Sequence, residues 1–115
     1  MIIKAINIYT STGEVVNIPY ENFMRNPSCH VNKRKRGSFD TVSLDFKVDS
    51  NLKVLGRKGS VHNNLVDVLS NSDITGIEIE TKSARLFGQV DSAENKKFEY
   101  LKPLGDNAYR LRVVS

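Results

Sequence analysis

The sequence predicts an α+β domain that is mostly antiparallel β-sheet, with about seven strands and one short helix. Two observations carry this prediction. Several short segments alternate apolar and polar residues, most clearly residues 42–48, as expected of strands with one buried face. A single segment, after Ser60, instead places its apolar residues at helical spacing.

The N-terminal half begins with a predicted β-hairpin. Residues 2–9 are rich in β-branched side chains, and residues 10–13 have the composition of a turn. Residues 14–18 form the expected return strand. The segment between Pro19 and Pro27 has little periodicity and leads to a basic loop at residues 32–38, and further strands are expected at residues 42–48 and 52–55.

The helix and the C-terminal strands follow. Ser60 is expected to cap a helix of about three turns, whose apolar stripe is Val61, Leu65, Val68 and Leu69. The remaining chain predicts a β-meander, with turns at residues 91–95 and 103–107. Its expected strands are residues 77–80, 84–90, 96–101 and 108–114.

Composition sets the class of protein. The 115 residues fit one domain, residues 1–115, and carry a formal net charge of +4. Ten basic and five acidic residues lie in residues 1–60, which favours an anionic partner such as a nucleotide or nucleic acid. We expect a cytoplasmic protein without a membrane segment, because no long apolar run occurs and Cys29 is the sole cysteine.

Catalytic and metal-binding motifs are scarce. Cys29 and His30 are adjacent, but neighbouring residues in a loop rarely face one another, and no orienting group is evident. No paired Cys-x-x-Cys or His-Glu-x-x-His spacing occurs. We therefore expect no enzyme activity, no metal and no cofactor. An acid–base nuclease would require the fold to bring His30 and His62 together.

Binding residues are better represented. Arg57 and Lys58 lie in a Gly/Ser-flanked loop before the expected helix, where backbone N–H groups and side chains can hold a phosphate. Ordinary helix capping explains the same pattern. In the strand at 84–90, Arg85 and Phe87 share the face opposite the core, which is typical of a platform for base stacking. The alternative is that Phe87 belongs to the core.

Two further basic features complete the set. Arg110 and Arg112 alternate with apolar residues in the last strand and share one face. The run Lys33–Arg36 places four cations in a row, which either bind a polyanion or form a solvated loop.

The length, the layout of elements and the Ile/Asn/Lys-rich composition resemble the first family of phage Thoeris anti-defence proteins. Those proteins bind and sequester the cyclic ADP-ribose-type signal of bacterial TIR enzymes, some also hold cyclic oligonucleotides, and they assemble as dimers or higher oligomers. The resemblance implies that Phe87 stacks on the base and that Asn95 assists it. It also implies that Arg57 and Arg110 or Arg112 bind the phosphates.

Two functions are therefore expected. The first is a signal sponge that binds a cyclic nucleotide without cleaving it, acting in the host bacterial cytoplasm. The second is a small basic nucleic-acid-binding domain or nuclease inhibitor, whose affinity would fall steeply as salt rises.

Overall fold

The computed structural model describes residues 3–24, 29–33, 39–56, 61–62, 68, 73–89 and 101–114. These residues form ten strands in two antiparallel sheets and one short 3-10 helix, η1 (Tyr20–Asn22). The prediction of a mainly antiparallel β fold is confirmed. The six-stranded sheet has the order β6-β5-β2-β1-β7-β8, and its strands are β1 (Ile3–Thr10), β2 (Val15–Pro19), β5 (Lys53–Leu55), β6 (Val61–His62), β7 (Ile74–Thr81) and β8 (Arg85–Gln89).

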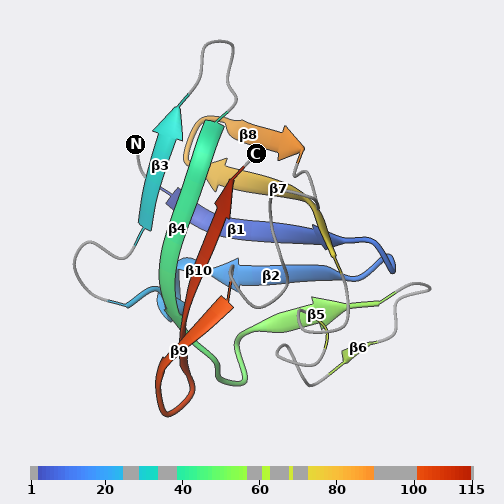
Figure 1. The fold of residues 1–115 in the computed structure, drawn as a ribbon, viewed down its shortest axis with the longest axis vertical. Coiled ribbons are helices and arrows are strands. Elements are labelled where there is room, and N and C mark those ends of the chain that lie inside the picture. The colour runs from blue at the N-terminus through green and yellow to red at the C-terminus, as the bar shows by residue number, and fades with distance from the viewer. Residues whose placement is uncertain are drawn as a thin grey trace.

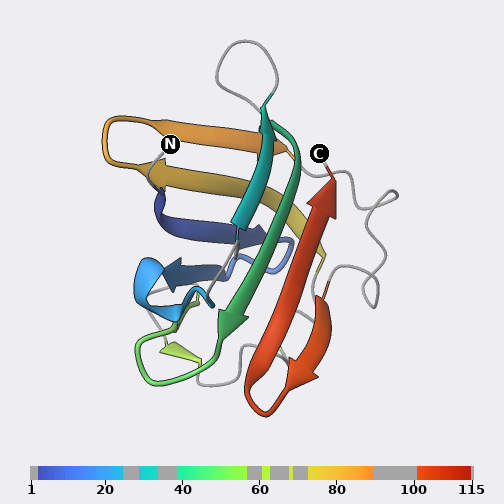
Figure 2. The same ribbon diagram turned by 90° about the vertical axis from the view of Figure 1, so that its left-hand side faces the viewer.

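The second sheet has four strands in the order β3-β4-β10-β9. They are β3 (Cys29–Lys33), β4 (Phe39–Lys47), β9 (Leu101–Gly105) and β10 (Ala108–Val114). Figures 1 and 2 show the long strands β4 and β10 running crosswise over β1, β2 and β7, so the two sheets pack as a crossed sandwich. Each sheet consequently has one face on the core and one outer face.

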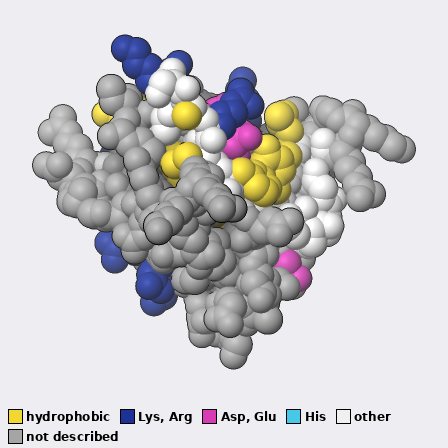
Figure 3. Space-filling view, turned by 90° about the horizontal axis from the view of Figure 1, so that it is seen from above, with side chains coloured by type: hydrophobic (Ala, Val, Ile, Leu, Met, Phe, Trp, Pro, Cys, Tyr) yellow, Lys and Arg dark blue, Asp and Glu magenta, His cyan; other side chains and the backbone are white. Residues whose placement is uncertain are grey.

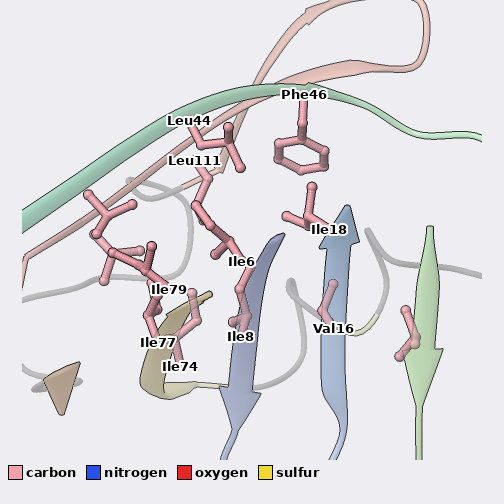
Figure 4. Packing of buried hydrophobic residues seen from close by; sticks show 13 residues of the cluster. Ile6, Ile8, Val16, Ile18, Leu44, Phe46, Ile74, Ile77, Ile79 and Leu111 are labelled. Carbon is pink, nitrogen blue, oxygen red and sulfur yellow. The ribbon is translucent and has the colours of Figure 1, made fainter. Parts of the chain in front are cut away.

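The core fills the space between the sheets. In Figure 4, Phe46 of β4 points toward Ile18 of β2, and Leu111 of β10 lies above Ile6 of β1. All four side chains are fully buried. Alternation in the sequence set most of this arrangement, because the buried residues of β2 and of β4 are two positions apart. Strand β7 departs from this period, since its buried Ile74 and Ile77 are three positions apart. The buried apolar cluster is Ile6, Ile8, Val16, Ile18, Val42, Leu44, Phe46, Val54, Ile74, Ile77, Ile79, Leu111 and Val113.

The predicted N-terminal hairpin is confirmed. Strands β1 and β2 pair antiparallel, with Ile6 opposite Ile18 and Ile8 opposite Val16. The turn between them requires Gly13, whose φ of 91° lies in the left-handed region. The Thr10 hydroxyl donates to the Glu14 carboxylate and accepts from the Glu14 N–H, which closes the turn.

Helix η1 connects the six-stranded sheet to the four-stranded sheet. Asn22 is 1% exposed, and its Nδ2 donates to the Lys47 carbonyl and to Asp49 Oδ1, both at 2.8 Å. Hydrogen bonds from Asn22 and then from the Asn51 N–H hold the pKa of Asp49 below its ordinary 3.8. Asn22 Oδ1 finds no partner among the described residues. This network fixes the chain where it leaves the first sheet.

Two predictions for the middle of the chain are corrected. The helix does not begin at Ser60, because Val61–His62 form β6 and pair with β5. The rest of that segment lies outside the described residues, except Val68, which is helical and packs against the core. Residues 29–33, expected to belong to an irregular segment and a loop, form β3 and pair with β4.

The C-terminal strands form two hairpins in different sheets rather than one continuous meander. Strand β8 pairs with β7 in the six-stranded sheet, whereas β9 pairs with β10 in the four-stranded sheet. The turn expected at residues 103–107 is shorter, because Leu101–Gly105 is strand and Asn107 supplies the left-handed residue with φ of 55°. Residues 96–100 lie outside the described residues.

Candidate functional site

The outer face of the six-stranded sheet carries the exposed aromatic side chain that the sequence indicated. Phe87 is 49% exposed and lies on β8, pointing away from the core. Its ring meets the Tyr9 ring of β1 edge to face, with centroids 5.9 Å apart and an interplanar angle of 61°. The expectation that Phe87 faces outward is therefore confirmed, and the interpretation of Phe87 as a core residue is wrong.

Gly76 of β7 makes this aromatic contact possible. The strand β7 lies between β1 and β8, and Gly76 is directly opposite Tyr9. A Cβ atom at Gly76 would lie 2.8 Å from Phe87 Cζ and 3.2 Å from Cε2. The absence of a side chain therefore lets the Phe87 ring lie across β7 and reach Tyr9.

A chain of polar side chains runs beside the two rings. Asn17 Nδ2 donates to Asn7 Oδ1 at 2.7 Å, and Asn7 Nδ2 donates to Glu78 Oε1 at 3.0 Å. Arg85 forms ion pairs with both glutamates: its Nη2 lies 3.2 Å from Glu80 Oε1, and its Nη1 lies 3.8 Å from Glu78 Oε1. The interactions cross β2, β1, β7 and β8, and they hold Arg85 beside Phe87 on the same face.

This aromatic face is close to neutral. Among the residues that the strand register pairs across this face, Arg85 and Lys53 are the cations, and Glu78 and Glu80 are the carboxylates. The Arg85 side chain is 69% exposed, whereas Glu78 and Glu80 are 16% and 27% exposed. Exposed ion pairs of this kind contribute about 0–1 kcal/mol, so Arg85 can exchange its carboxylates for another anion. Figure 3 shows hydrophobic side chains beside acidic and basic ones on the described surface.

Arg110 and Arg112 lie on a different face from Phe87. Both are exposed on β10, on the outer face of the four-stranded sheet, and the core separates the two outer faces. Arg110 donates from Nε and Nη2 to the two Asp45 carboxylate oxygens, at 2.7 and 3.0 Å. This hydrogen bonding, and then the Asp45 charge, raise the pKa of Arg110. Arg112 makes no ion pair within the described part of the chain.

The structure thus brings Phe87 and Arg85 together and keeps Arg110 and Arg112 apart from them. The remaining predicted binding residues, Arg57, Lys58 and Asn95, lie outside the described residues.

Sequence reasoning missed several residues of the aromatic face, among them Tyr9, Gly76 and Asn7. The alternation of residues 6–9 places Asn7 and Tyr9 opposite the core, which was an available signal. The contact with Phe87 and Gly76 depends on the order β1-β7-β8, which no local pattern specifies.

The other chemical groups are dispersed. The two histidines lie on strands of different sheets, His30 on β3 and His62 on β6. Among the described residues, no group of three or more His, Cys, Asp or Glu side chains is placed to hold a metal ion. No helix in that same part of the chain has the length and apolarity to span a membrane. A scan against protein-family models, a search of curated proteins and a search of solved structures each found no match.

Proposed function

We propose that the chain binds a nucleotide signal at the aromatic face and holds it without cleaving it. Following the resemblance, the proposed ligand is a TIR-derived cyclic ADP-ribose, with cyclic oligonucleotides as further ligands. Its capture in the host bacterial cytoplasm would block Thoeris-type immunity. The observation that carries the proposal is the half-exposed Phe87 ring, supported from one side by Tyr9 and accompanied by Arg85.

The aromatic face offers a purine one rigid surface. Stacking of a base on an aromatic side chain contributes about 1–3 kcal/mol. The edge contact with Tyr9 limits the orientations of the Phe87 ring, so little freedom remains to be lost when a base stacks on it. Tight capture, with a Kd below micromolar, needs more than about 8 kcal/mol, and the phosphates must supply the difference.

Phosphate binding at this face requires more cations than Arg85. Because Glu78 and Glu80 already neutralise Arg85, a phosphate must displace them or find other donors. We assign this role to Arg57 and Lys58, with Asn95 beside the base. A second copy of the chain would supply further cations if the protein forms the dimer or higher oligomer that the resemblance implies. Light scattering after size-exclusion chromatography measures that state directly.

The test is retention of the intact signal. Purified protein is incubated with the product of a TIR reaction, dialysed and heated, and the released nucleotide is identified by mass spectrometry. The proposal expects the unaltered cyclic nucleotide, and a hydrolysed product would identify an enzyme instead.

A matched pair of variants locates the site. Phe87→Ala should weaken binding about 5- to 150-fold, which corresponds to the loss of one stacked base. Leu104→Ala removes a comparably exposed apolar side chain from β9 of the other sheet and should leave binding unchanged. Equal affinities for both variants would place the ligand elsewhere.

A further inference from the structure

We propose that the outer face of the four-stranded sheet is a second binding surface, which takes the phosphate backbone of single-stranded DNA or RNA. This basic face is defined by Lys47, Lys102, Arg110 and Arg112. It is distinct from the aromatic face proposed to hold a nucleotide, because the two lie on different sheets with the core between them.

The strand register brings these cations together. Arg110 is directly opposite Lys102 on β9 and directly opposite Asp45 on β4, so the three side chains share one row of the outer face. Arg112 lies two residues further along β10, about 6.6 Å away along the strand. Lys47 lies two residues from Asp45 and is exposed. Residues distant in sequence thereby form one continuous charged surface.

The charge of the basic face is strongly positive. Among the residues that the strand register pairs across this face, Asp45 is the one carboxylate, against four exposed cations. Asp106, which is also exposed, lies in the turn between β9 and β10. The aromatic face, in contrast, balances Arg85 and Lys53 with two glutamates. A surface with this excess of cations attracts a polyanion through release of condensed counterions, and its binding depends strongly on salt.

Asp45 positions Arg110 rather than removing it from use. Two of the five N–H donors of the Arg110 guanidinium bind Asp45, which leaves three. The Arg110 side chain is 51% exposed, so those donors remain accessible to a phosphate. A guanidinium that is already fixed loses less conformational freedom when it binds.

The composition of the basic face also indicates what kind of recognition to expect. No aromatic side chain faces outward among its described side chains, since Phe46 and Tyr109 point to the core side of the sheet. Base stacking is therefore missing, and contacts to phosphates carry no sequence information. We expect binding that is insensitive to base sequence.

The magnitude follows from the charges. Three net positive charges give a slope of log K against log salt of about −2, because each phosphate contact on a single strand contributes about −0.7. Affinity should then fall about 20-fold between 50 and 200 mM salt.

The experiment measures fluorescence anisotropy of labelled, mixed-sequence 15-residue DNA and RNA strands across a salt series. Replacing Lys102 and Arg112 with alanine should weaken the binding of both nucleic acids at low salt. It should also flatten the slope of log K against log salt by about 1.4. The control replaces Arg85 and Lys53, which removes the same charge from the aromatic face, and should change affinity less than twofold. Circular dichroism checks that both variants are folded.

The outcomes separate the two surfaces. Equal losses in both double variants would show a general charge effect and would overturn the inference, as would the absence of wild-type binding at 50 mM salt. Phe87→Ala should leave the affinity for the DNA and RNA strands unchanged. A loss of that affinity in the Phe87 variant would indicate one site shared by the two ligands and would overturn the inference. A strong preference for one base sequence would also contradict backbone binding. If only DNA or only RNA binds, the basic face stands and the sugar determines the partner.

Discussion

Truncation of Phe87 tests the position of the ring without any ligand. Complete burial of a phenylalanine side chain contributes about 1.5–3 kcal/mol, and an edge-to-face aromatic contact adds about 0.5–1.5 kcal/mol. Phe87 is 49% exposed and makes one such contact. Phe87→Ala should therefore lower the free energy of unfolding by about 2 kcal/mol.

Phe46 provides the internal standard for this measurement. It is fully buried between the sheets, and truncation of a buried phenylalanine to alanine costs about 3–5 kcal/mol. Urea unfolding of both variants, followed by tyrosine fluorescence with equal m-values, gives the two losses directly. The Phe87 variant should remain clearly more stable than the Phe46 variant.

A double-mutant cycle isolates the contact between the rings. Tyr9→Leu and Phe87→Leu, measured singly and together, should give a coupling energy of about 0.5–1.5 kcal/mol. A Phe87→Ala loss as large as that of Phe46→Ala would mean that the ring is buried. A coupling energy of zero would mean that the rings do not touch. Either result refutes the described aromatic face.

Substitutions at three other positions test further features by the same unfolding measurement. Gly76→Ala should displace the Phe87 ring while improving strand propensity, so its net loss should stay below about 1 kcal/mol; a loss of several kcal/mol would show that the ring cannot move. Asp49→Asn should destabilise at pH 7, because the lowered pKa of Asp49 makes its ionised form stabilising above 3.8. The difference in unfolding free energy between the wild type and this variant should shrink as the pH falls through the lowered pKa of Asp49. A difference that stays constant with pH would exclude linkage to Asp49. Asn107→Gly should be nearly neutral, whereas Asn107→Val should cost about 1–2 kcal/mol or more, since φ is 55°; equal stability of the two variants would contradict that backbone conformation.

The sequence predicted which side chains face the core, and did so well. The alternation of residues 42–48 and of Phe87 with its neighbours gave the correct faces of β4 and β8, because the two-residue period of a strand is a local property. It could not assign each strand to a sheet. Pairing is set by contacts between distant residues, and the partition of β8 and β10 between two sheets has no local signature.

The same limit applies to the candidate site: the face of each side chain could be predicted from the sequence, whereas the side chains that lie together could not. Phe87 and Arg110 each carry the local pattern of an outward-facing residue, which suggested one shared site. The two residues occupy outer faces of different sheets, because β8 pairs with β7 and β10 pairs with β4. The proximity of Tyr9 to Phe87 was likewise hidden, since Gly76 and the strand between them determine it.

Pro103 has a consequence for how the protein can associate with itself. It lies in β9, the outermost strand of the four-stranded sheet, beside the charged Lys102. A proline nitrogen carries no hydrogen, and a lysine resists close approach of a like-charged copy, so this border is a poor template for an incoming strand. Growth of fibrils or ribbons by edge-to-edge joining is thereby discouraged along β9, which leaves the four-stranded sheet finite on that side.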